Sequence, residues 1–171
     1  VKGIVGPWVH QYPHTAVPGP QVGFLQEALR WWDRWLKGLP NGAEDDPGLR
    51  AYVLDAAPPD ASAPFRPGHW VAEPAWPSPR VTDQTLHLTP GALSTSPVPL
   101  TVPVCTPQHL GLQAGEFFPM GLAAEMPGDQ RPDDALSVCF DGPVLTAPLT
   151  LLGQTRLDLT LSSDRPRAFI V

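Results

Sequence analysis

His10 is the side chain whose sequence surroundings are most suited to chemistry. It follows a short apolar run at residues 2–5 and the turn Gly6-Pro7-Trp8, and a strongly amphipathic segment lies downstream. An imidazole in such a place can take a proton from a hydroxyl nucleophile and later return it to a leaving group. A loop histidine can equally serve a structural hydrogen bond, so the rest of the sequence must decide between the two.

The chain offers His10 no matching nucleophile. A serine on a strand-to-helix turn is expected in a G-x-S-x-G motif, and no such motif occurs. Four serines lie in the wrong context for such a nucleophile: Ser94, Ser96, Ser162 and Ser163. The sequence thus holds a candidate general base without the group on which it would act.

His14 lies four residues after His10, a spacing that can place two metal ligands on one helix face. Pro13 disfavours a helix between them, and no carboxylate or third ligand is adjacent. We therefore predict no metal site and no cofactor, with His14 at the surface or supporting the site. The remaining histidines are interpreted as structural or solvent-facing: His69, His87 and His109.

The paired aspartates, the cysteines and the tryptophans are predicted to have structural roles and not catalytic ones. The pairs Asp45-Asp46 and Asp133-Asp134 sit in turns, where adjacent carboxylates do not face each other across a substrate, so we predict solvated loop charge. Cys105 and Cys139 lack a CxxC spacing, and two buried thiols are a better prediction than one disulfide. The tryptophans are predicted to pack: Trp31, Trp32 and Trp35 on a helix, Trp8 beside the histidine loop, and Trp70 and Trp76 in proline-rich loops.

The elements that must position His10 can be read from the first 40 residues. Residues 2–5 predict a short buried parallel strand, and the three prolines of residues 11–20 predict a loop. Apolar residues recur at spacings of three and four over residues 21–37, which predicts a helix with one buried face and an Asp33–Lys37 pair. Gly38 and Pro40 should end it.

Beyond the helix the pattern changes to short strands. Residues 41–48 are polar and rich in turn formers, so we place a domain boundary there, dividing the chain into residues 1–43 and 44–171. Residues 90–119 are expected to form long loops, and the final apolar run suggests that the last strand continues beyond the chain. The predicted strands are residues 49–54, 84–88, 135–140, 149–151, 155–161 and 168–171, which together favour an antiparallel β-sandwich.

Composition agrees with this interpretation and excludes other classes. The chain has 24 prolines in 171 residues, about 14% against a usual ~5%, which indicates short strands joined by stiff loops. With 11 basic and 17 acidic residues, no basic stripe and no long apolar span, neither nucleic acid nor a membrane is an expected partner. The first residues do not form a signal peptide, and a cytoplasmic location is slightly favoured.

Three segments in series resemble one family of enzymes. Residues 6–10, GPWVH, are similar to a GPWxH motif whose histidine is catalytic; residues 32–38, WDRWLKG, are similar to a closing helix ending FFDRWLKG. Residues 129–132, DQRP, and the apolar residues that follow resemble a stretch of a jelly-roll domain, although part of the usual sequence after Pro132 is missing. The family is the cocaine esterase / X-Pro dipeptidyl-peptidase serine hydrolases, which also includes α-amino acid ester hydrolases and glutaryl acylases.

The resemblance implies a mainly β chain. Residues 1–43 would be the last strand, histidine loop and closing helix of an α/β-hydrolase domain, and residues 44–171 a C-terminal jelly-roll sandwich. His10 would be the catalytic histidine, while the serine and aspartate would lie upstream in a missing N-terminal portion. The substrate would be a small ester or peptide cleaved through an acyl-enzyme, and the chain alone would be inactive. Peptidase, esterase and acylase are not ranked, and a homo-oligomer is left open.

A different class of protein remains as the alternative. Residues 49–171 could form a non-catalytic sandwich that binds carbohydrate or protein, with the preceding helix as a linker. That interpretation predicts an independently stable sandwich with exposed aromatic side chains. The codons upstream of Val1 would discriminate, because only the hydrolase hypothesis requires a G-x-S-x-G elbow and an aspartate there.

Overall fold

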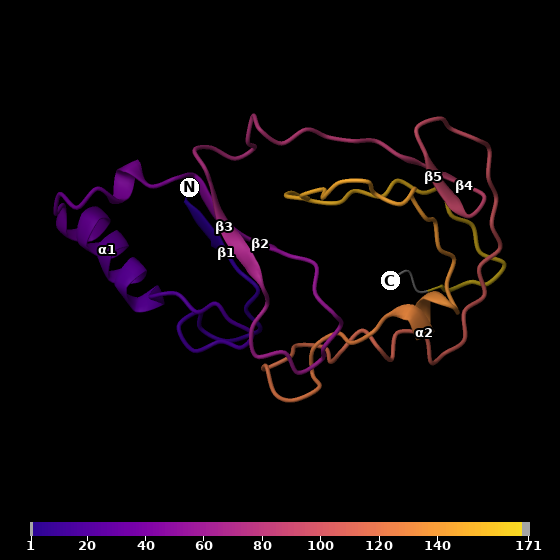
Figure 1. Cartoon of the computed structure of the whole chain (residues 1–171), viewed down its shortest axis with the longest axis horizontal. Helices are drawn as coiled ribbons and strands as arrows, with labels where there is room; N and C mark the ends of the chain where they lie inside the picture. The colour runs from indigo at the N-terminus through magenta and orange to yellow at the C-terminus, as the bar shows by residue number, and fades with distance from the viewer. Residues whose placement is uncertain (1, 169–171) are drawn as a thin grey trace.

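The computed structural model describes residues 2–168, which form short strands, a few helical segments and long loops (Figure 1). The class is therefore mainly β with few helices, as the sequence predicts. No helix among the described residues is long and apolar enough to cross a membrane. In chain order the elements are β1 (Gly3–Val5), α1 (Phe24–Lys37), η1 (Ala43–Asp45), β2 (Leu49–Leu54), β3 (Gly68–Glu73), β4 (His87–Thr89), β5 (Ala92–Ser94) and α2 (Arg131–Asp134).

A three-stranded sheet in the order β1-β2-β3 forms the centre of the N-terminal half. β1 runs parallel to β2, with Gly3 opposite Leu49, and β3 runs antiparallel to β2, with Gly68 opposite Leu54. The predicted first strand and the strand at residues 49–54 are confirmed, but β1 is half-buried rather than buried, and its partner comes from the other side of the predicted domain boundary.

Gly68 shows why β3 can lie so close to β2. A Cβ atom at Gly68 would meet the Val53 carbonyl oxygen at 2.2 Å, which no side chain can tolerate. Glycine is therefore required for the ladder to close at this end. Strand β3 was not predicted, because its residues, GHWVAE, do not alternate regularly between apolar and polar.

Helix α1 begins at Phe24, three residues later than predicted, and ends at Lys37 as predicted. Gly38 takes the left-handed conformation with φ 72°, and the N–H groups of Gly38 and Leu39 donate to the carbonyls of Arg34 and Asp33, which closes the last turn. Lys37 pairs with Asp33 at 2.6 Å, which confirms the expected i,i+4 pair. No α1 side chain is fully buried, so a covered apolar face is not observed among the described residues.

The C-terminal half contains less regular structure than the sequence predicts. Of the predicted strands there, only residues 84–88 overlap an observed strand, β4, which pairs with β5 in a tight hairpin. Residues 135–140, 149–151 and 155–161 form no strand, and residues 169–171 of the last predicted strand lie outside the described residues. The expectation of long loops at residues 90–119 is confirmed apart from β5.

The missing strands have a physical cause. An alternating pattern gives a strand only where a neighbouring backbone supplies a hydrogen-bonded ladder. In residues 135–168 of the structure, strand pairing is limited to a single bridge between Asp141 and Ala92, and Pro143 and Pro148 remove backbone donors nearby. Cys139 lies in this region and Cys105 in the loops of residues 90–119. Both are exposed free thiols, so the prediction of buried thiols is wrong.

The buried core is small and lies around the three-stranded sheet and the loop before α1. A folded monomer of this mass exposes about 8,000 Å² of surface. The chain exposes 13,528 Å². The buried apolar side chains are Ala16, Ala43, Ala51, Val53 and Ala63. The described residues therefore leave much apolar surface uncovered.

Candidate active site

The histidine loop starts from a strand end that is fixed by aromatic packing. A Cβ at Gly6 would meet the Trp8 ring at 2.7 Å, so glycine lets Trp8 fold back over the end of β1. The Trp8 indole N–H donates to the Pro20 carbonyl at 2.8 Å, and its ring lies 6.1 Å from that of Trp70. Trp8 thus packs beside the histidine loop as predicted, whereas Trp70 lies on β3 rather than in a loop.

The His10 side chain is exposed and stacks on an aromatic ring from the C-terminal half of the chain. The imidazole and Phe118 ring centroids lie 3.8 Å apart with an angle of 34° between the planes. The His10 backbone N–H donates to the Pro119 carbonyl at 3.2 Å, and the Gln11 side-chain amide donates to the Met120 carbonyl, 109 residues away. The fold therefore joins two segments that are distant in sequence at His10.

The segment that contacts His10 is a closed loop, residues 116–125, which we call the Phe118 loop. The Glu116 N–H donates to the Glu125 carbonyl at 2.9 Å and closes its ends. The Glu125 carboxylate accepts hydrogen bonds from the Met120 and Leu122 N–H groups at 2.7 and 3.2 Å. Gly121 lies so close to the loop before α1 that a Cβ would meet the Val17 carbonyl at 2.7 Å. The contact of this loop with His10 was not predicted; the adjacent aromatic pair Phe117-Phe118 is the sequence feature that could have indicated it.

His10 has no serine or carboxylate partner in the part of the chain that the structure describes. Neither a carboxylate nor a serine hydroxyl of residues 2–168 forms a hydrogen bond with its imidazole. The His10 side chain stays exposed beside the tilted Phe118 ring.

The other histidines do not gather into a ligand set. His14 is half-buried: its ring stacks on Phe24 at 5.9 Å, and its Nδ1 atom is buried without a hydrogen-bond partner. His69 and Asp55 are both more than half exposed and lie 3.6 Å apart. Among residues 2–168, no three His, Cys, Asp or Glu side chains come close enough to hold a metal ion.

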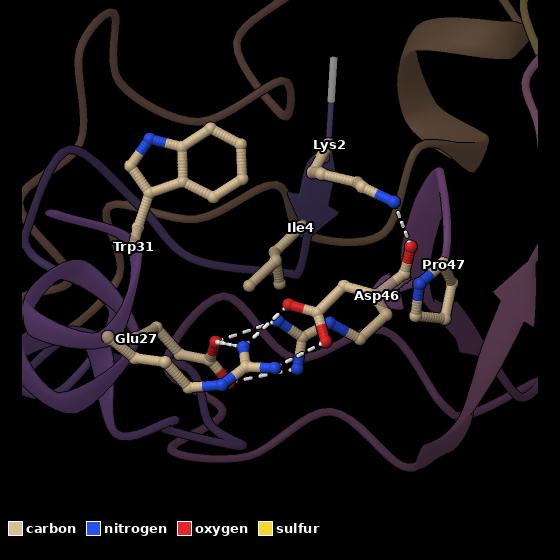
Figure 2. Close-up of a pocket in the computed structure, with 9 residues that line it drawn as sticks. Lys2, Ile4, Glu27, Trp31, Asp46 and Pro47 are labelled. Carbon is tan, nitrogen blue, oxygen red and sulfur yellow. Dashed lines mark hydrogen bonds and ion pairs between the residues drawn. The ribbon is translucent and has the colours of Figure 1, made fainter. Parts of the chain in front are cut away.

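Two of the four predicted solvated carboxylates are instead firmly held. Asp46 forms a bidentate pair with Arg30 at 2.6 and 2.7 Å, and the Lys2 amine donates to its backbone carbonyl (Figure 2). Asp133 is 9% exposed and accepts hydrogen bonds from the N–H groups of Gly111 and Gln113 at 3.1 and 2.9 Å. The sequence prediction failed for both because it considered only chain neighbours, and their partners lie 16 to 22 residues away.

Asp46 belongs to a network of four charges between α1 and the start of β2, which we call the ion clamp: Glu27, Arg30, Asp46 and Arg50. Arg50 binds Glu27 through both guanidinium NH groups at 2.9 Å. The hydrogen bonds from Arg50 hold the pKa of Glu27 below its ordinary value, and those from Arg30 do the same for the pKa of Asp46. The adjoining hollow of about 160 Å³ (Figure 2) is smaller than usual ligand pockets of roughly 300–1,000 Å³. We therefore regard the clamp as structural.

The tryptophans of α1 pack only in part. Trp31 and Trp35 contact each other with ring centroids 5.6 Å apart, and the Arg34 guanidinium lies 5.5 Å from the Trp35 ring. Trp32 and Trp35 each remain 52% exposed. Core packing of this cluster is thus not observed in the described chain.

The architecture defines the class as a mainly β domain that follows a strand, a histidine loop and a helix. The family model for the X-Pro dipeptidyl-peptidase C-terminal non-catalytic domain matches residues 41–171. Because this match spans more than half of the chain, the chain belongs to that family. No curated protein and no solved structure matches it.

The match supports the family resemblance at a coarse level only. It identifies a non-catalytic domain that belongs to peptidase-family proteins, and it points to no particular enzyme such as cocaine esterase. His10 lies outside the matched residues, whereas the Phe118 loop lies within them. The contact between the two therefore joins the candidate base to the family's non-catalytic domain.

Proposed function

We propose that this chain supplies the catalytic histidine, His10, and the C-terminal β domain of a serine hydrolase that cleaves ester or amide bonds. The observation that carries the proposal is the position of His10: an exposed imidazole in a GPWVH loop, after a strand and ahead of a domain of the X-Pro dipeptidyl-peptidase family. The serine and aspartate of the triad would come from polypeptide outside these 171 residues.

In this proposal His10 acts twice as a proton carrier. It takes the serine hydroxyl proton while the serine oxygen bonds to the substrate carbonyl carbon, and the imidazolium then gives that proton to the departing alcohol or amine. A water molecule next attacks the acyl-enzyme, again losing its proton to His10, which finally returns it to the serine oxygen. The aspartate would hold the imidazole in the correct tautomer.

The same proposal covers the domain organisation. Residues 1–43 would complete an α/β-hydrolase domain, and residues 44–171 would form the jelly-roll domain beside it. The exposed apolar stripe of α1 supports this arrangement because a stripe of that kind normally packs against another layer. The β domain would contribute no triad residue, but its Phe118 loop would line one side of the active site.

A first test reads the coding sequence upstream of Val1. A G-x-S-x-G elbow followed by an aspartate is the expected result. A start codon or an unrelated domain in that place would overturn the hydrolase proposal and favour the binding-module alternative.

A second test measures turnover by the polypeptide that contains both the elbow and this chain. Hydrolysis of a p-nitrophenyl ester and an X-Pro p-nitroanilide would be compared for wild type, His10→Ala and His109→Ala. Loss of the base should lower kcat about 10³-fold or more. His109 is an exposed turn residue, so His109→Ala is the matched control and should be unaffected. Near wild-type turnover by His10→Ala would remove His10 from the mechanism.

A further inference from the structure

We infer that Phe118 is a positioning residue for His10, and that the Phe118 loop holds the imidazole in the orientation needed for proton transfer. The structural part of this inference concerns the contact itself. Its catalytic part rests on the proposed function, since only a hydrolase would use the orientation for proton transfer.

The contact restrains both the ring and the backbone of His10. The Phe118 ring lies 3.8 Å from the imidazole centroid, and the neighbouring Pro119 carbonyl accepts the His10 N–H at 3.2 Å. A ring so close to the imidazole restricts its side-chain rotation, and the His10 side chain still remains exposed. Catalytic groups need this kind of support because small errors in orientation cost much of the rate.

Core packing does not explain the contact. Phe118 is 56% exposed, so its ring is not part of the buried core, and its close partner is the imidazole face. Its backbone is also unusual, with φ 67° in a residue that is not glycine. Such a conformation is unfavourable and persists where the surroundings fix it. Here the Glu125 carboxylate and the close approach of Gly121 to Val17 fix the loop.

Phe117 provides a matched control within the same loop. It is the same residue type, one position earlier, and is 98% exposed. Its ring packs on Phe118 at 6.2 Å rather than on His10. A general effect of losing an aromatic ring from this loop would therefore appear in both variants, whereas loss of positioning should appear in Phe118→Leu alone.

The structural test uses NMR with histidine-selective labelling on the full polypeptide that contains this chain, and it needs no catalytic activity. The His10 ring protons should be shifted upfield by the Phe118 ring current. Phe118→Leu should abolish that shift, Phe118→Tyr should retain it, and Phe117→Leu should leave it unchanged. Glu125→Gln, which changes neither ring, should reduce it by weakening the loop. The signals of His14, which stacks on Phe24 at 5.9 Å, report whether each variant remains folded. A His10 shift that is equal in wild type and Phe118→Leu would overturn the inference.

The catalytic test uses the polypeptide that carries the serine elbow. Phe118→Leu should lower kcat by about 10-fold to 10²-fold with KM little changed, because orientation of the base is lost while substrate contacts remain. Phe118→Tyr should restore kcat. An unchanged kcat in a Phe118→Leu enzyme whose ring-current shift is lost would overturn the positioning role. If the His10 ring-current shift is observed but the His10→Ala enzyme has normal turnover, the proposed function is overturned while the contact between Phe118 and His10 is established.

Discussion

The ion clamp allows the sharpest prediction about what holds the N-terminal helix in place. Arg50 on β2 binds Glu27 on α1 through two hydrogen bonds of 2.9 Å, and the side chains of both residues are about one-third exposed. Replacing Arg50 with Met keeps the aliphatic stem and removes the charge. We expect the helix to lose its main polar attachment to the sheet.

The size of the effect follows from burial and geometry. An exposed pair contributes at most about 1 kcal/mol, and hydrogen bonds to a charged group contribute about 1.5–3 kcal/mol when shielded from water. The Arg50–Glu27 pair is bidentate but partly wet, so we expect a coupling energy of about 1–2 kcal/mol. The Asp33–Lys37 pair, whose lysine side chain is 63% exposed, should give only about 0.3–0.5 kcal/mol.

The assay is a double-mutant cycle in urea, followed by tryptophan fluorescence. The variants are Arg50→Met, Glu27→Gln and the double variant, with Lys37→Met, Asp33→Asn and their double variant as the matched cycle. Trp31 and Trp35 lie on α1 and report its release. A coupling energy for Arg50–Glu27 no larger than that for Asp33–Lys37 would refute the idea that the clamp attaches the helix.

Three further outcomes follow from the same structure. The pKa values of Glu27 and Asp46 are lowered from their ordinary 4.5 and 3.8, so the stability that these carboxylates contribute is complete above about pH 5 and is lost as the pH falls through the lowered values. Urea midpoints should therefore be level from pH 7 to 5 and fall below pH 5. A midpoint that rises on acidification would contradict this direction. Gly68→Ala should destabilise by about 2 kcal/mol or more because its Cβ would overlap the Val53 carbonyl, whereas Gly142→Ala, with open space, should be neutral in the same melt. Asp133→Ala should cost about 1–3 kcal/mol because two backbone N–H groups lose their acceptor, and equal stability of the variant would show that water replaces it.

The parts of the fold that could be predicted depend on local signals. Helix α1 could be predicted because its periodicity, Gly38 and Pro40 all lie within one stretch of chain, and β2 because its apolar run is bounded by turn residues. The strand predicted at residues 155–161 is absent from the structure. Its alternation of apolar and polar residues is a local signal, whereas a strand also needs a hydrogen-bonded partner from elsewhere in the chain. The same limit explains Asp46 and Asp133, whose partners are distant in sequence.

Only part of the candidate site could be predicted from the sequence, for the same reason. His10 could be found from a short motif and from the order of the elements around it. Phe118 could not, because a contact between residues so far apart leaves no spacing to recognise, and because Phe118 lies in a stretch that was predicted only as loop. A close aromatic pair followed by Pro119 and Gly121 was the only trace of it in the sequence.

The orientation of α1 joins these observations. In an ordinary surface helix the apolar stripe faces the core and the charged face meets water. Here the charged face, with Glu27, Arg30 and Arg34, pairs with Asp46, Arg50 and Glu44 around the start of β2. The apolar stripe remains more than half exposed: Leu25, Leu29, Trp32 and Leu36. Three ion pairs join the polar face to residues 44–50: Arg30–Asp46, Arg34–Glu44 and Arg50–Glu27. The β domain therefore cannot also cover the stripe without breaking these pairs. Under the proposed function the stripe is thus the face left for the α/β-hydrolase layer, and the clamp sets the angle at which that layer, His10 and the β domain meet.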